Sequence, residues 1–320
     1  MRDHGGNIDG ARQRFGGARE AWIDLSTGIN RVPYPLPGIS ADAWTMLPTQ
    51  TAIAGLVEVA QRRYRTRARL LPVAGAQAAI QMIPLLAPPG LARVLGPTYN
   101  EHAAALTAAG WTVETVADPD ALAGADMAVL VNPNNPDGRR LTPDEIRALG
   151  PLVGRLVVDE SFADPEPALS VAPDAGRGLL VLRSFGKFYG LAGLRLGFVL
   201  GGAEDIARLG EMAGPWPVSG AAIEIGRAAL GDEAWAAATA TRLCAEAIAL
   251  DRLASCAGWR LVGGTSLFRL YETGDAAAAQ ERLAATQIWS RRFPWSAGWL
   301  RLGLPGPAEE WKRIEAALGH

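Results

Sequence analysis

Cysteine is scarce in this sequence of 320 residues, which contains only Cys244 and Cys256. Both fall in a segment whose pattern predicts helix, so we expect inert buried thiols and neither a disulfide nor a metal pair. Scarce cysteine also indicates a reducing compartment. The N-terminal segment lacks the apolar core of a signal peptide, and no metal site is expected.

Excess charge of one sign and long apolar runs are also missing. The net charge is -2, so the chain has no basic field to hold nucleic acid or an anionic membrane. No apolar run reaches membrane-spanning length without a charge or a cluster of Pro or Gly. We therefore expect a soluble, cytoplasmic protein that binds neither nucleic acid nor membrane. Its length allows one large domain and a smaller one.

Strand and helix patterns alternate from about residue 49 onward. Short apolar runs bounded by polar residues predict buried strands at residues 93–96, 127–131, 155–158, 179–182 and 196–200. Helix patterns accompany them at residues 51–63, 75–86 and 101–109 and from Thr142. The alternation predicts an α/β fold: a mostly parallel open sheet with helices on both faces and the ligand at the carboxyl ends of the strands.

Two segments flank this pattern. The opening segment, to about residue 37, is rich in Gly, Pro and Asn, which predicts an extended arm. After residue 216 the chain is Ala-rich and helical to residue 254, and short strands follow near residues 260–270 and 299–302. We expect an N-terminal arm at 1–44 that contributes to a small domain and the substrate site. A large domain at 45–215 and a small α+β domain at 216–320 follow.

Polar residues follow the predicted strands. Asn135 lies in the run N-P-N-N-P-D-G after one strand, and Asp159 directly follows another. Lys187 comes shortly after a third, and Arg195 stands between glycines at the start of a fourth. Each residue alone has a plainer interpretation: a turn, a helix cap or a solvated surface charge. Their common position at strand ends instead favours one site.

These residues match the chemical groups of pyridoxal phosphate (PLP). Lys187 lies among aromatic residues, where the neutral, nucleophilic amine needed for the cofactor aldehyde is favoured. Asp159 can keep the pyridine nitrogen protonated, and Asn135 can donate to the phenolic oxygen. The other expected contacts are a ring-stacking aromatic and donors for the phosphate. The expected cofactor-binding residues are Gly75, Ala76, Gln77, Tyr99, Asn135, Asp159, Ser184, Lys187 and Arg195.

The ordered motifs N-P-N-N-P-x-G, D-E-S-F, S-F-G-K and G-L-R-L-G resemble those of the class I and II aminotransferases, PLP enzymes of fold type I. The resemblance covers nearly the whole chain. It implies that Lys187 is the catalytic Schiff-base lysine and that the protein is a homodimer with its site near the subunit interface.

The two ends of the chain narrow the resemblance. Residues 4–7 (H-G-G-N), 24–30 (D-L-S-T-G-I-N) and 299–306 (W-L-R-L-G-L-P-G) are similar to segments of the threonine-phosphate decarboxylases of cobalamin biosynthesis. The implied reaction converts O-phospho-L-threonine, a phosphorylated amino acid, to (R)-1-amino-2-propanol phosphate and carbon dioxide. The substrate-binding residues implied by this resemblance are His4, Asn30 and Arg301.

Which of the three holds phosphate and which holds carboxylate stays open. The remaining histidines, His102 and His320, lack a comparable context, so we interpret them as structural or solvated. Two rival functions also stay open. One is a histidinol-phosphate-type aminotransferase, and the other is a non-catalytic protein of the same fold that acts as a sensor or an assembly partner.

Three positions depart from the family pattern. Phe162 stands where aminotransferases usually have Tyr, so one donor to the cofactor's phenolic oxygen is missing. Asp137 replaces a common Thr, which we interpret as a turn variation. Leu47 precedes Pro48 where relatives often have a Tyr that reaches the neighbouring subunit's cofactor, so that contact is in doubt.

Overall fold

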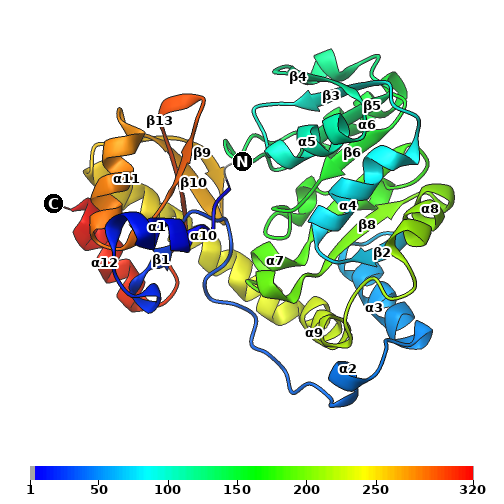
Figure 1. Cartoon of the computed structure of the whole chain (residues 1–320), viewed down its shortest axis with the longest axis horizontal. Helices are drawn as coiled ribbons and strands as arrows, with labels where there is room; N and C mark the ends of the chain where they lie inside the picture. Colours follow the sequence, from blue (N-terminus) through cyan, green and yellow to red (C-terminus); the bar gives the residue numbers. More distant parts are fainter. Residues whose placement is uncertain (1–3, 320) are drawn as a thin grey trace. The chain divides into compact units, whose positions relative to one another are not determined.

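The structure is a computed structural model that describes residues 4–319, and the chain forms two compact units (Figure 1). The larger unit consists of Tyr34–Asn135 and Arg139–Ala237. The smaller unit is built from the N-terminal segment up to Pro33, the short stretch Pro136–Gly138 and the C-terminal part from Ala238.

A seven-stranded sheet forms the centre of the larger unit, in the order β2-β8-β7-β6-β5-β3-β4. Its strands are β2 (Arg69–Val73), β3 (Leu91–Leu95), β4 (Thr112–Val116), β5 (Met127–Val131), β6 (Leu156–Asp159), β7 (Leu179–Ser184) and β8 (Gly197–Gly201). The pairings among β3 to β7 are parallel, and β8 runs antiparallel to both β7 and β2. The five predicted strands and the mostly parallel sheet are confirmed.

Two strands of this sheet, β2 and β4, were not predicted. Strand β4 lies at the edge of the sheet and has a largely exposed, polar sequence, so it lacks the apolar run of a buried strand. Strand β2 contains Pro72, which counts against a strand assignment from sequence. All residues of β5 and β6, in contrast, are buried, as expected for strands covered on both faces.

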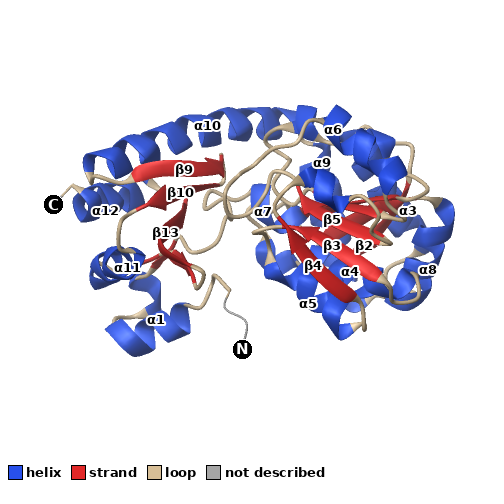
Figure 2. Cartoon of the chain, turned by 90° about the horizontal axis from the view of Figure 1, so that it is seen from above, coloured by secondary structure: helices blue, strands red, loops and turns tan. Residues whose placement is uncertain are grey.

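Helices lie on both faces of the sheet (Figure 2). They are α2 (Asp42–Thr45), α3 (Gln50–Arg63), α4 (Ala76–Met82), α5 (Asn100–Ala108), α6 (Pro143–Leu149), α7 (Phe185–Phe188), α8 (Ala203–Ala213) and α9 (Gly220–Gly231). The predicted start of α6 is confirmed, because Thr142 and Glu145 form a reciprocal capping box around Pro143. The long helix α10 (Glu233–Cys256) begins in this unit and continues into the smaller one.

The smaller unit contains a four-stranded antiparallel sheet and a short pair of parallel strands. The sheet has the order β12-β13-β10-β9, and the pair is β1 with β11. The strands are β1 (Ile23–Asp24), β9 (Arg260–Thr265), β10 (Phe268–Glu272), β11 (Ile288–Trp289), β12 (Arg291–Phe293) and β13 (Ser296–Gly303). The remaining helices are α1 (Ile8–Phe15), α11 (Ala276–Ala285) and α12 (Ala308–Leu318).

Two sequence-based expectations about these segments are wrong. The opening segment is not extended throughout, because α1 begins where the Asn7 side chain accepts a hydrogen bond from the backbone of Gly10. This helix buries Ala11 against Trp22 and Ala284, a contact that its composition does not reveal. The thiols of α10 are exposed and not buried. Among residues 4–319, no helix is long and apolar enough to cross a membrane.

Candidate active site

A cavity in the larger unit opens where β5, β6 and β7 end. These three strands are neighbours, and Val131 at the end of β5 pairs with Asp159 at the end of β6. All nine residues predicted to bind the cofactor line this cavity. The others lining it are Ile80, Val131, Ser161, Phe162, Gly186, Ala192 and Leu196.

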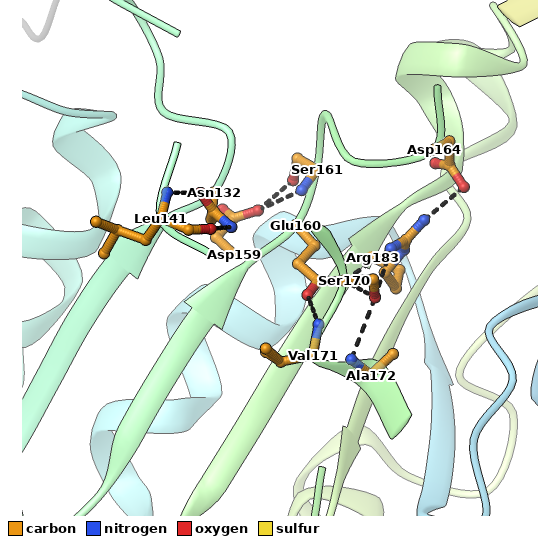
Figure 3. Close-up of polar contacts among 10 residues, drawn as sticks. All are labelled: Asn132, Leu141, Asp159, Glu160, Ser161, Asp164, Ser170, Val171, Ala172 and Arg183. Atoms are coloured by element: carbon orange, nitrogen blue, oxygen red, sulfur yellow. Dashed lines mark hydrogen bonds and ion pairs between the residues drawn. The ribbon is translucent and has the colours of Figure 1, made fainter. Parts of the chain in front are cut away.

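The buried carboxylate of Asp159 lines this cavity and accepts several hydrogen bonds. Its Oδ2 is 2.8 Å from Nε2 of His102. Its Oδ1 accepts hydrogen bonds from the hydroxyl and backbone N–H of Ser161 (Figure 3). A carboxylate only accepts, so His102 must carry its proton on Nε2. Burial raises the pKa of Asp159, but the hydrogen bonds from His102 and Ser161 outweigh it and hold that pKa below its usual value. The group is therefore charged at neutral pH.

His102 is a functional residue that the sequence analysis missed. It is almost completely buried, so of the two expected alternatives, a structural residue or a solvated one, the solvated one is wrong. It follows Tyr99 by one helical turn on α5, and that spacing places both side chains on one side of the helix start. The spacing was the available signal. His320 lies outside the described residues.

The half-buried Lys187 has an apolar setting. It belongs to the short helix α7, between the fully buried rings of Phe185 and Phe188. Its Nζ lies 5.7 Å from the ring centroid of Phe162, which reaches the cavity from the segment after β6. Lys187 therefore lies in the cavity with aromatic rings on several sides, and Asp159 lines the same cavity.

Glycines let the guanidinium of Arg195 approach the start of α4. Gly75 caps this helix at a φ of +77°, and a Cβ on Gly75 would come within 2.7 Å of Nη2 of Arg195. A Cβ on Gly197 would likewise come within 2.4 Å of the backbone nitrogen of Ala76. Backbone N–H groups and a guanidinium in such a cradle suit a phosphate. Ser184, the last residue of β7, lines the same cavity.

The ring of Tyr99 is held by its hydroxyl. This hydroxyl donates to Oε1 of Gln77 at 3.2 Å, and Gln77 in turn donates to the buried carboxylate of Glu101 at 3.3 Å. Tyr99 and Gln77 both line the cavity, and the link through Gln77 to Glu101 holds the ring in one orientation. A planar heterocycle with a phosphate arm fits a site of this kind.

The three residues predicted to bind substrate all belong to the smaller unit. His4 is exposed and lines a second cavity together with Ser26 and Arg291. Arg301 is buried, donates from Nη2 to the carbonyl oxygen of Ser26 at 2.7 Å, and stands over the ring of Phe268. Ser26 therefore joins His4 and Arg301 in one region.

Asn30 has a different environment from that expected for a direct ligand. Its side chain is 2% exposed, and Oδ1 accepts hydrogen bonds from Nη2 of Arg242 at 2.9 Å and from the backbone of Val32. These contacts give it a role in holding the neighbouring arginine and the chain that follows it.

Arg291 is a second residue that the sequence analysis missed. It pairs with Arg301 across β12 and β13. Burial lowers the pKa of Arg301 to about 9, and the positive charge of Arg291 contributes to that lowering. Two guanidinium groups held together in this way favour a bound anion. Register across a hairpin was the signal that could have identified Arg291, but it requires the turn to be placed correctly.

A model of the family described as aminotransferase class I and II matches residues 47–318. The chain belongs to this family. The expected fold type and resemblance are thereby confirmed.

Two relatives within the family match the sequence of this chain over nearly its full length. The chain is 45% identical to a threonine-phosphate decarboxylase of a Sinorhizobium species, over 98% of this chain and 97% of the relative. It is 41% identical to a threonine-phosphate decarboxylase of Pseudomonas aeruginosa, over 99% and 97%. Among solved structures, histidinol-phosphate aminotransferase from Sinorhizobium meliloti in complex with pyridoxal-5'-phosphate superimposes with a TM-score of 0.85 at 19% identity, covering 97% of this chain and 93% of the other. That structural likeness shows the fold.

The departures from the aminotransferase family pattern have clear places in the structure. Phe162 is buried and lines the cavity, where it contributes a ring but no hydroxyl. Leu47 is 64% exposed in the larger unit. Within residues 4–319 no group of three or more His, Cys, Asp or Glu side chains could hold a metal ion.

Proposed function

We propose that this aminotransferase-family chain is a PLP-dependent threonine-phosphate decarboxylase that acts in cobalamin biosynthesis. Its reaction converts O-phospho-L-threonine to (R)-1-amino-2-propanol phosphate and carbon dioxide. The observation that carries the proposal is the near full-length identity of 45% and 41% to two relatives of that name. The residues of the two cavities support it.

The cavity of the larger unit fits the cofactor group by group. Lys187 would hold the aldehyde carbon covalently, and the charged Asp159 would keep the pyridine nitrogen protonated. Asn135 would donate to the phenolic oxygen, while Ser184 and Arg195, with the start of α4, would hold the phosphate. When bound, PLP supplies an electron sink for the electron pair that stays behind as carbon dioxide leaves.

The smaller unit supplies the binding residues for a dianionic substrate. A wholly buried guanidinium beside a second one is costly, and an anion offsets that cost through charge-assisted hydrogen bonds. We assign Arg301 and Arg291 to this role, with His4 as a further donor. Asn30 accepts a hydrogen bond from Arg242 and so holds that guanidinium in place.

Orientation of the substrate decides which bond to Cα breaks. Aminotransferases lose the Cα proton, whereas a decarboxylase loses the carboxylate, although the electron sink is the same. Binding energy from the remote phosphate can be used to turn the carboxylate into the reactive position. The residues that hold the two anionic groups therefore separate this function from its main rival, a histidinol-phosphate-type aminotransferase.

We also infer a homodimer located in the cytoplasm. The homodimer is the expectation for this family of PLP enzymes, and the absence of excess charge agrees with a cytoplasmic location. Light scattering coupled to size-exclusion chromatography tests the assembly, for which twice the mass of the 33.7 kDa chain is expected. A monomeric holoenzyme with full activity would contradict it.

One incubation tests the reaction. Holoenzyme is mixed with O-phospho-L-threonine in the absence of any keto acid, and carbon dioxide is measured together with the cofactor's absorption spectrum. Stoichiometric release of carbon dioxide over many turnovers is expected. A single turnover that leaves pyridoxamine phosphate would identify an aminotransferase instead. Full biological activity in the Lys187→Ala variant would favour the non-catalytic alternative.

A further inference from the structure

A buried guanidinium, that of Arg183, joins both ends of a short segment behind the cofactor cavity. Its Nη1 lies 2.7 Å from Oε2 of Glu160, and its Nη2 lies 2.6 Å from Oδ1 of Asp164 (Figure 3). The side chains of Arg183, Glu160 and Asp164 are nearly inaccessible, at 3%, 0% and 2% exposure. Arg183 is thus bonded to the first and the last residue of the segment 160–164.

The residues of this segment face two ways. Asp159, Ser161 and Phe162 line the cavity, whereas Glu160 and Asp164 do not. This division follows the alternation of side chains along an extended chain, and a turn closed by the Ala163 N–H to Glu160 carbonyl bond brings Phe162 round. The cavity-lining residues and the ion-paired ones are therefore parts of one rigid piece of backbone.

Further contacts immobilise the ion pairs. Glu160 accepts a hydrogen bond from the backbone of Val171 at 2.6 Å and another from the hydroxyl of Ser170. The guanidinium carbon of Arg183 stands 4.4 Å from the ring centroid of Tyr64. Arg183 itself directly precedes Ser184, which also lines the cavity.

Stability gives a weak reason for such a cluster. The desolvation free energy of three buried charged groups offsets most of their electrostatic attraction. Well-packed apolar residues at the same positions often stabilise a fold equally well. What apolar residues cannot supply is a fixed position for two backbone points at once, which a planar, bidentate guanidinium provides. The cluster therefore calls for an explanation based on geometry.

We propose that Arg183 is a positioning residue that, through Glu160 and Asp164, aims the Asp159 carboxylate and the Phe162 ring at the cofactor ring. This inference rests on the cofactor site. It holds whether the reaction is decarboxylation or transamination, so the test needs no substrate.

The test compares Arg183→Met and Arg183→Lys with a matched control. Arg155 directly precedes β6 at its other end, and its Nη2 lies 2.7 Å from Oδ1 of Asp205 with both side chains mostly buried. Arg155→Met therefore also breaks a shielded ion pair next to the same strand. For each purified variant one measures the dissociation constant for PLP, the pH midpoint of the visible absorption band and the melting temperature.

Arg183→Met is expected to weaken PLP binding by about 10-fold or more, the usual scale for a lost orienting partner, and to move the pH midpoint. Arg183→Lys keeps the charge but reaches one carboxylate at a time, so its effect is expected to be smaller. Arg155→Met is expected to lower the melting temperature and leave PLP affinity and the pH midpoint unchanged.

Two results would overturn the proposal. One is wild-type PLP affinity together with a wild-type pH midpoint in Arg183→Met. The other is an equal change in Arg155→Met, which would assign the effect to general destabilisation. If Arg183→Met does not fold, Asp164→Asn, which preserves shape, takes its place under the same criteria. A failed decarboxylation assay leaves this measurement unaffected, so the two proposals can fail separately.

Discussion

Nε2 of His102 lies 2.8 Å from Oδ2 of Asp159, and both side chains are only 4% exposed. This contact gives Asp159 a donor on the side away from Ser161, so hydrogen bonds reach both of its oxygens. Burial by itself would favour the neutral acid. The partnership with His102 keeps a negative charge where the cofactor's pyridine nitrogen is expected.

Replacing His102 should therefore weaken the site through Asp159. In His102→Phe the hydrogen bond is lost, burial dominates and the pKa of Asp159 rises. PLP affinity is expected to fall by about 10- to 100-fold. His102→Gln, whose amide N–H can replace Nε2, is the control and should retain most of the affinity. Equal losses in both variants would assign His102 a packing role only.

The same contact predicts a pH dependence of stability. The pKa of Asp159 is depressed in the folded protein, so its contribution is present at neutral pH and is lost as the pH falls through that depressed value. Denaturant titrations of wild type and His102→Phe should diverge at neutral pH and converge in acid. A constant difference between them at every pH would contradict this origin.

Lys187 can be identified chemically with little ambiguity, because the sequence contains only one other lysine, Lys312. The Lys312 side chain is 71% exposed on α12, in the smaller unit, and has no aromatic enclosure comparable to that of Lys187. Borohydride reduction of the yellow holoenzyme should fix the cofactor on the peptide that contains Lys187. Peptide mass mapping measures this, with Lys187→Ala as a colourless control. Label on Lys312 would refute the assignment.

The sequence predicted the cavity of the larger unit well because parallel strands end at one edge. Asn135, Asp159 and Lys187 each follow an apolar run, and local pattern alone locates those runs. The role of His102 was not predicted from the sequence. His102 lies one helical turn after Tyr99, and its contact with Asp159 depends on which side of α5 packs against β6. That is a tertiary contact, which local pattern does not contain.

The smaller unit was harder to predict for a related reason. Arg301 was identified only through resemblance, and its neighbour Arg291 is related to it by hairpin register. Helix α1 depends on packing of Ala11 beneath Trp22, a contact that composition rich in Gly and Asn conceals. Short strands and turns whose stability comes from distant partners are poorly encoded in local sequence.

Phe162 provides a test of the missing hydroxyl. Because Phe162 lines the cavity, the new hydroxyl in Phe162→Tyr is expected to donate to the cofactor's phenolic oxygen, which stabilises the anionic form of that oxygen. The pH midpoint of the visible band is therefore expected to move to lower pH, while the melting temperature changes little. Spectrophotometric titration of both proteins measures the midpoint. An unchanged midpoint would indicate that the ring at position 162 does not reach the phenolic oxygen.

Arg301 should control substrate binding and not cofactor binding. In Arg301→Gln one charge-assisted hydrogen bond to the substrate is lost, worth about 1.5–3 kcal/mol, so KM for O-phospho-L-threonine should rise by about 10- to 100-fold. The cofactor spectrum should stay unchanged.

Because the pKa of Arg301 is lowered to about 9, its positive charge is present at neutral pH and is lost as the pH rises through that value. Substrate affinity of the wild type is therefore expected to fall above pH 9, and the variant should lack this fall. A wild-type KM in Arg301→Gln, or an identical pH profile in the two proteins, would remove Arg301 from the substrate site.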